Sequence, residues 1–171
     1  MGSDELRLTA RHDLTPDEID ELEQRIYEYN ASKTGHGDAA QIGFTLHSGE
    51  ALIGAAAGYT WAGMCELRQL WMDETHRGQG YGRKLLLQFI EEARSRHCTK
   101  VYVATYEFQA PRFYNRFGFR PVAAVNGRPS GHLDILMCLT LERTPVNDAG
   151  SADARDRPPP QVATSRAAGL Y

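Results

Sequence analysis

The spacing of hydrophobic residues along the chain changes several times, and each change predicts a new element. Apolar and polar residues alternate through positions 6–11, which is the pattern of a half-buried strand. A helix is expected to begin at Thr15-Pro16-Asp17-Glu18, since this run supplies a capping hydroxyl, a first-turn proline and a glutamate three residues after the cap. Residues 30–38 are polar and include two glycines, which predicts a mobile loop. The expected helix carries its apolar residues on one face: Ile19, Leu22 and Ile26.

Further along, apolar runs predict six strands, and two runs with helical spacing predict helices between them. The expected strands are residues 41–47, 52–60, 66–72, 101–105, 119–125 and 133–141, with a hairpin turn at Ser48-Gly49-Glu50. The expected helices are residues 81–97 and 109–117. A strand–helix–strand unit of this spacing is expected to be parallel and right-handed.

The strand at 52–60 is unusually slim, because three alanines lie between Gly54 and Gly58. Small side chains there would either leave room for a bound molecule or allow close packing against a helix. The sequence leaves both interpretations open.

Length and composition predict one compact domain followed by a tail. The chain has 171 residues, of which 42% are hydrophobic, enough for a single core. We expect the domain to span residues 1–143 and the proline-containing stretch 144–171 to be disordered. The net charge of −3 gives no general attraction to nucleic acid or anionic membrane, so neither is expected as a partner. No signal peptide or membrane span is visible, which predicts a cytoplasmic protein.

The cysteines and histidines give no sign of a disulfide framework or a metal centre. The three cysteines, at positions 65, 98 and 138, are far apart and outside any C-x-x-C pattern. The six histidines lack the spacing of a metal-ligand pair. We therefore expect reduced thiols and no metal.

The strongest chemical signal is the glycine-rich run Arg77-Gly78-Gln79-Gly80-Tyr81-Gly82, between a predicted strand and a predicted helix. Glycines let main-chain amides converge on an anion, and the helix start adds free N–H donors and positive dipole. A dinucleotide fingerprint would need glycine at position 83, which is Arg83, and an NTP-binding loop would need Lys and Ser or Thr directly after Gly82. The run therefore predicts a bound phosphate ester of another kind.

The Arg-x-x-Gly-x-Gly run in this setting resembles the GNAT-type N-acetyltransferases, whose cofactor is acetyl-CoA. The resemblance begins at Leu70 and resumes at Phe108–Phe119, which resembles a bacterial subgroup with a Phe-Gln-Ala-x-x-Phe-Tyr motif. It implies an α/β (α+β) fold, a single domain whose mixed, mostly antiparallel sheet of about six to seven strands splays at a central parallel pair and is flanked by about four helices. It also implies a homodimer as a common assembly.

The resemblance further implies which residues hold acetyl-CoA. Loop residues 77–83 would grip the pyrophosphate, mostly through their N–H groups, and the main chain of the preceding strand would bind the pantetheine arm and polarise the thioester carbonyl. Glu107 replaces an asparagine that contacts this arm in the common family pattern. The implied coenzyme-binding residues are Leu70, Trp71, Met72, Arg77, Gly78, Gln79, Gly80, Tyr81, Gly82, Arg83, Gln109 and Phe113.

The resemblance also implies two catalytic residues. Tyr114 falls at the family's general acid, which would protonate the departing thiolate. Glu66 falls where some members have a general base, and the predicted strand would place it on the same face as Arg68, Leu70 and Met72. A water chain is the competing base, and Arg68 could instead hold Glu66 in a structural pair.

The expected activity is acetyl transfer to a primary amine, with a small-molecule acceptor preferred over a protein lysine. An acetyl-cysteine route through Cys65 is not favoured, because it would need a base-activated thiolate. His132 lies in a segment that resembles the subgroup's acceptor region, where it would contact the acceptor or cap a turn. A sensor of the same fold with little turnover stays open as an alternative, favoured by Glu107.

Overall fold

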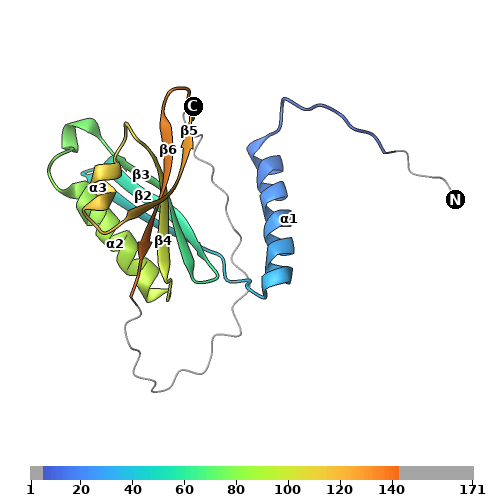
Figure 1. Cartoon of the computed structure of the whole chain (residues 1–171), viewed down its shortest axis with the longest axis horizontal. Helices are drawn as coiled ribbons and strands as arrows, with labels where there is room; N and C mark the ends of the chain where they lie inside the picture. The colour runs from blue at the N-terminus through green and yellow to red at the C-terminus, as the bar shows by residue number, and fades with distance from the viewer. Residues whose placement is uncertain (1–5, 143–171) are drawn as a thin grey trace, which may run out of the picture.

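Strands from the whole length of the domain form one central sheet (Figure 1). The protein is described here from a computed structural model, which covers residues 6–142. The strands are β1 (Ala40–Ser48), β2 (Ala51–Trp61), β3 (Met64–Met72), β4 (Lys100–Tyr106), β5 (Arg120–Asn126) and β6 (Leu133–Thr140). The helices are α1 (Pro16–Thr34), α2 (Tyr81–Ser95) and α3 (Pro111–Asn115), with a short 3-10 turn, η1 (Glu74–His76). The predicted tail, 144–171, and the predicted domain end at 143 lie outside the described residues.

The sheet has the strand order β1-β2-β3-β4-β6-β5. β3 and β4 run parallel, and the other neighbouring pairs of the described sheet are antiparallel. The parallel pairing extends only from Met64 and Lys100 to Leu67 and Val103, after which the two strands separate. This confirms the expected mixed sheet with six strands that opens at a central parallel pair.

A β-bulge in β3 changes which side chains face the core. In the register with β2, Ala57 lies opposite Gln69 and Gly58 lies opposite Leu67, so Arg68 is an extra residue on β3. A Cβ atom added to Gly58 would lie 1.9 Å from the carbonyl oxygen of Glu66 and 2.9 Å from Cζ of Phe89. Glycine is therefore required where β2 crosses the bulge.

Close packing, and not an open space, explains the small residues of β2 on the face of the sheet that α2 covers. A Cβ at Gly54 would meet Sδ of Met72 at 2.5 Å and Cδ1 of Leu85 at 3.1 Å. Both glycines of β2 thus allow β3 and α2 to approach. Of the two interpretations that the sequence left open, the packing one is confirmed for Gly54 and Gly58.

Helix α2 covers one face of the sheet and supplies much of the core (Figure 1). Its predicted apolar stripe is buried as expected, and burying each large aliphatic or aromatic side chain stabilises the fold by about 1.5–3 kcal/mol. The predicted helix 109–117 is shorter, because a turn closed by the Gln109 N–H and the Tyr106 carbonyl precedes it, and i→i−3 bonds replace the α-helical ones after Asn115. The buried residues of α2 are Leu85, Leu86, Phe89, Ile90 and Ala93.

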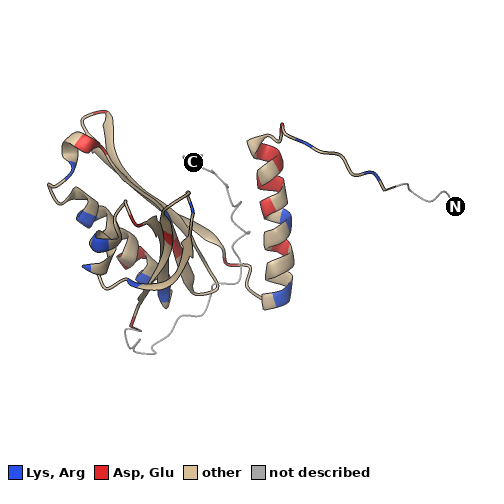
Figure 2. Ribbon diagram, turned by 45° about the horizontal axis from the view of Figure 1, so that its top comes forward, with Lys and Arg blue, Asp and Glu red and all other residues tan. Residues whose placement is uncertain are grey.

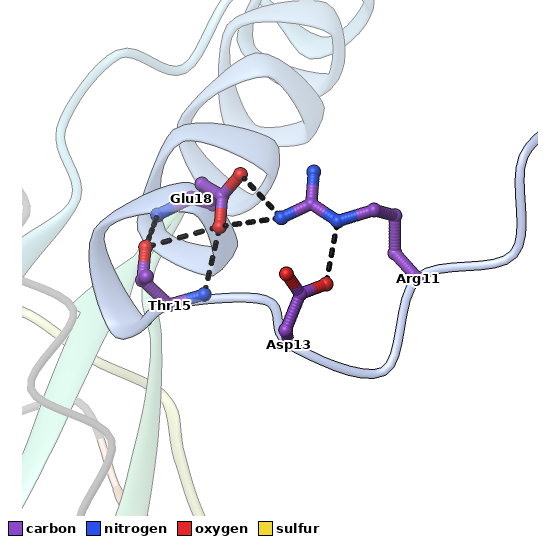
Figure 3. Close-up of polar contacts among 4 residues, drawn as sticks. All are labelled: Arg11, Asp13, Thr15 and Glu18. Atoms are coloured by element: carbon purple, nitrogen blue, oxygen red, sulfur yellow. Dashed lines mark hydrogen bonds and ion pairs between the residues drawn. The ribbon is translucent and has the colours of Figure 1, made fainter.

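Helix α1 begins as the sequence predicts. Thr15 caps it, the N–H of Glu18 donates to the Thr15 hydroxyl, and the Glu18 carboxylate accepts from the Thr15 N–H at 2.8 Å (Figure 3). These contacts lower the pKa of Glu18, with the backbone hydrogen bond from Thr15 as the largest cause. No residue of α1 is buried, and Figure 1 shows the helix standing apart from the sheet.

Two predictions for the N-terminal region are wrong. Residues 6–11 form no strand, and Leu8 is fully exposed; instead Arg11 bends towards the start of α1, where it pairs with Asp13 and Glu18 (Figure 3). An alternating segment forms a strand only when it hydrogen-bonds to the edge of a sheet. Within the described sheet, the edge strand β1 pairs with β2 alone, so residues 6–11 are not paired with it. The expected loop 30–38 is helical to Thr34, because the chain continues the helix until Gly35 ends it with a φ of 73°.

The count of helices is three, with one 3-10 turn, in the described part of the chain, against about four expected. No helix in that part combines the length and the apolar character needed to cross a membrane. Its His, Cys, Asp and Glu side chains form no group of three or more that could hold a metal ion.

Candidate active site

The glycine-rich loop is fastened to the end of β3 by side chains. Arg77 Nε donates to the carbonyl of Met72 at 3.2 Å, and Gln79 Nε2 donates to the carbonyl of Thr75 at 3.2 Å. Asp73 accepts from the Thr75 N–H at 3.0 Å and contacts Nδ1 of His76 at 2.9 Å. The Thr75 hydroxyl also donates to the Asp73 carboxylate, and this hydrogen bond is the largest cause of the lowered pKa of Asp73. The side chains of Arg77 and Gln79 thus hold the loop, and its main chain is left to face outwards.

Six consecutive main-chain N–H groups, of residues 78–83, donate no hydrogen bond to any described residue. Gly78 and Gly80 have positive φ values of 76° and 83°, a conformation that glycine adopts without strain. Gly80 is the N-cap of α2 and offers no side-chain acceptor to the first turn. An unfilled row of donors at a helix start is a favourable binding site for a phosphate group.

Positive charge gathers around this loop. Figure 2 shows Lys and Arg positions, in blue, on the ribbon of α2 and the preceding loop, whereas Asp and Glu positions dominate α1. Arg83 and Lys84 lie in the first turn of α2, next to the free N–H groups. The local charge is therefore suited to an anion, although the whole chain is slightly acidic.

Gly82 lets the start of α2 lie against the end of β3. A Cβ there would be 3.5 Å from Cγ of Met72 and 4.0 Å from Cζ of Phe113. Leu70 and Met72 pack against the core, whereas Trp71 is 45% exposed. The predicted coenzyme residues of β3, the loop and α3 are therefore brought to one end of the sheet.

At this end, the main chain of β3 is open on the side of β4. No described strand pairs with β3 there beyond Leu67, so the segment around Leu70 keeps main-chain donors and acceptors without a strand partner. An extended ligand arm can pair with such an edge. This opening in the strand pairing lies on the side of the glycine-rich loop, which follows the end of β3.

Tyr114 is buried beside this end of the sheet. Its side chain is 6% exposed and packs edge-on against Phe113 and Phe119, at centroid distances of 5.3 and 5.6 Å. The hydroxyl makes no hydrogen bond with a described residue, which is unusual for a buried polar group. Burial raises the pKa of Tyr114 to about 12, so the phenol stays protonated at neutral pH.

Gln109 and Glu107 both hold the turn between β4 and α3. Gln109 Oε1 accepts from the Tyr106 N–H at 3.0 Å, and Glu107 Oε1 lies 3.0 Å from Nδ1 of His132. Phe108 packs against the same imidazole ring at a centroid distance of 4.8 Å. His132 therefore joins the β5–β6 hairpin to this turn.

Glu66 lies on the opposite face of the sheet from Leu70 and Met72, contrary to the prediction. Cys65 and Leu67 face the core before the bulge, whereas Leu70 and Met72 do so after it. The extra residue Arg68 shifts the alternation by one position, which a strict period of two cannot foresee.

Glu66 instead lines a groove of about 420 Å³ on the face away from α2. We call this the sheet groove. Beside the lining residues, Glu66 Oε2 lies 3.5 Å from Nε of Arg68, and the Arg68 guanidinium stacks 4.5 Å from the centroid of the Tyr59 ring. Burial, and then the charge of Glu66, raises the pKa of Tyr59. The sheet groove is lined by Tyr59, Trp61, Met64, Cys65, Glu66, Tyr102, Ala104 and Leu136.

Tyr59 and Tyr102 are groove residues that the sequence analysis missed. Each is directly opposite Glu66 in the register of its strand, Tyr59 on β2 and Tyr102 on β4. The signal that could have found Tyr59 is the hairpin register between β2 and β3, since a cross-strand neighbour shares the face of Glu66.

Cys65 lacks the setting of a nucleophile. It is 1% exposed, and burial raises the pKa of its thiol to about 12. A thiol kept protonated attacks poorly, so Cys65 is poorly suited to act as a nucleophile.

Comparison with known proteins now bears on this site. The family described as the "Acetyltransferase (GNAT) family" matches residues 5–119. The chain is 33% identical over 104 residues to acetyltransferase Atu2258 of Agrobacterium fabrum. The matched stretch spans 60% of this chain and 76% of that protein. The chain is 36% identical over 83 residues to blasticidin-S acetyltransferase of Streptomyces morookaense, covering 47% of this chain and 60% of that protein.

A solved structure from Bacillus anthracis str. Ames, in complex with acetyl coenzyme A, has a similar fold. It matches with a TM-score of 0.54 at 20% identity, over 60% of this chain and 63% of that one. At this identity the match supports the fold.

Proposed function

Because the chain belongs to the GNAT acetyltransferase family, we propose that it moves the acetyl group of acetyl-CoA to a primary amine of a small molecule. The observation that carries the proposal is the row of free N–H groups at residues 78–83, at the same end of the sheet as the opening beside β3 and the buried Tyr114 phenol. The free N–H groups would bind the diphosphate of the coenzyme, the open edge of β3 would bind its extended arm, and the Tyr114 phenol would lie beside the leaving sulfur.

In the proposed reaction, the neutral amine attacks the thioester carbonyl. A C–N bond forms, the tetrahedral intermediate collapses, and the C–S bond breaks with its electron pair on sulfur. The ammonium proton of the intermediate leaves to a base, and Tyr114 protonates the departing thiolate. The proton held by the base then restores the phenol, so the products are the amide and CoA with a free thiol. Burial raises the basicity of a thiolate as it raises that of a phenolate, so the two groups stay matched inside the same apolar site.

The loop is tested by replacing Gly80 with alanine. A side chain at a φ of 83° costs about 1 kcal/mol, and the main-chain donors turn away from the anion when the loop relaxes. We expect acetyl-CoA affinity to fall at least about tenfold, a loss of 1.4 kcal/mol. Isothermal titration calorimetry with acetyl-CoA measures it.

Gly49→Ala is the matched control, since Gly49 has a φ of 59° in the β1–β2 turn and also has open space around it. It should lower stability to a similar degree and leave acetyl-CoA affinity unchanged. Equal affinity in the wild type and the Gly80→Ala variant would contradict the proposed phosphate site.

Glu66 is proposed as the base on the acceptor side, directly or through a water. Its carboxylate lies in the sheet groove, where it forms an ion pair with Arg68 and interacts electrostatically with Tyr59. If Glu66 takes the proton itself, Glu66→Gln should lower kcat by about 10²-fold or more. Steady-state thiol release at saturating amine measures this, and a loss of less than about threefold would favour the water chain.

The small-molecule acceptor rests on two observations. The sheet groove, at about 420 Å³, lies within the usual range of about 300–1,000 Å³ for small-molecule sites. In addition, one relative carries a small-molecule acceptor in its name, blasticidin S. Thiol release from acetyl-CoA with a panel of small amines and with Nα-acetyl-lysine amide tests the proposal, and a marked preference for the lysine compound would favour the protein-lysine alternative.

A further inference from the structure

The walls of the sheet groove are aromatic and apolar. Trp61 and Tyr59 come from β2, Tyr102 comes from β4, and Ala104 and Leu136 add small and aliphatic surface. Aromatic faces bind flat apolar groups and also attract a cation held within about 6 Å. The groove is therefore suited to a molecule with an apolar ring and a positive end.

Trp61 is held in place from outside the sheet. Its Nε1 donates to the carbonyl of His36 at 2.9 Å, and its ring meets the Tyr27 ring edge-on at 6.4 Å. The indole is thus fixed both by α1, through Tyr27, and by the segment that follows it, through His36. A wall fixed in this way loses little entropy when a ligand packs on it.

The charge of the groove is small. Glu66 is the one charged residue among the described residues that line it, and Arg68 already lies 3.5 Å from its carboxylate. A carboxylate accepts up to about four hydrogen bonds, so a single ammonium can join the contacts from Arg68 and Tyr59. A second cationic group on the same ligand would meet aromatic or aliphatic surface and lose its hydration without compensation.

The location agrees with delivery of an amine to the thioester. Glu66 and Tyr102 are paired across β3 and β4, and one residue further along each strand the pairing ends. A ligand with its ammonium at Glu66 lies beside the opening through which the acetyl group would arrive. Its apolar body can extend along Trp61 and Tyr102.

We propose that the sheet groove binds the acceptor as an arylalkylamine-type monocation, with its ammonium at Glu66 and its ring against Trp61 and Tyr102. The proposal rests on the proposed acetyl-transfer function. It names the acceptor class as an apolar monoamine and excludes polycations such as polyamines and aminoglycosides.

The test uses the full chain with phenethylamine and tryptamine against spermidine and kanamycin. Thiol release from acetyl-CoA should give a kcat/KM at least about tenfold higher for the two arylalkylamines. A higher value for spermidine or kanamycin would overturn the proposal.

Trp61→Ala should raise the dissociation constant of phenethylamine about tenfold, measured by calorimetry, and leave acetyl-CoA affinity unchanged. Tyr29→Ala removes an exposed aromatic ring of α1 outside the groove and serves as the control. If a folded Trp61→Ala variant binds phenethylamine as tightly as the wild type, the groove is not the binding site.

The two proposals fail in different ways. Phenethylamine binding that depends on Trp61, without thiol release, would refute acetyl transfer to this amine and leave the groove assignment standing. Acetyl transfer to spermidine that does not depend on Trp61 would confirm the acetyltransferase and refute the groove assignment.

Discussion

Replacing Tyr114 with phenylalanine should lower kcat by about 10²-fold or more and leave the affinity for acetyl-CoA within about twofold. We propose the phenol as the group that protonates the departing thiolate, and phenylalanine keeps the ring packing against Phe113 and Phe119. Single-turnover thiol release measures the chemical step, and calorimetry measures coenzyme binding. A sensor with little turnover would show no change in either measurement.

Stability separates a catalytic role of this hydroxyl from a structural one. The buried hydroxyl has no hydrogen-bond partner among the described residues, so its removal abolishes an unpaid desolvation cost. Tyr114→Phe should therefore keep the Tm of the wild type or raise it. A clear loss of stability would show that the hydroxyl holds the fold together.

The pH dependence has a definite sign. Since burial raises the folded-state pKa of Tyr114 to about 12, above its ordinary value of about 10, the neutral phenol favours the folded state. Its contribution is fully present below pH 10 and is lost as the pH rises through about 12. The wild type should lose stability more steeply than Tyr114→Phe in this window, and an alkaline limb of activity near pH 8–9 would belong to another group.

Gly58→Ala should destabilise the protein by about 2–4 kcal/mol and abolish most activity. The added methyl group would lie 1.9 Å from the Glu66 carbonyl oxygen, a main-chain atom that the sheet holds in place. At roughly 2–4 °C per kcal/mol for a protein of this size, the Tm should fall by about 4–16 °C. Thermal unfolding followed by circular dichroism measures it.

Gly43→Ala is the matched control for this prediction. Gly43 lies on the neighbouring strand β1, opposite Ala57, and a Cβ there meets nothing within 4 Å. Alanine should be neutral or stabilise the strand by about 0.5–1 kcal/mol. If Gly58→Ala were as stable as Gly43→Ala, the bulge would not depend on a glycine at position 58.

Local signals in the sequence predicted the elements that local chemistry controls. The capping box at Thr15 and Glu18 fixed the start of α1, and the apolar spacing of residues 85–93 fixed the buried face of α2. The glycine-rich run predicted the unfilled main-chain donors at the start of α2, because such donors depend on glycines and on position.

Tertiary contacts decided the remaining features. The face of Glu66 depends on one extra residue at Arg68, and the main chain at Glu66 can lie close to β2 there because Gly58 has no Cβ atom. The alternating segment 6–11 forms no strand, because a strand needs an edge to pair with and a pattern cannot supply one. The sequence by itself thus determined the order of the helices and strands from Thr15 onwards and the glycine-rich start of α2. Which side chains form the walls of the sheet groove was decided only by strand register, because register brings together residues that are distant in the chain.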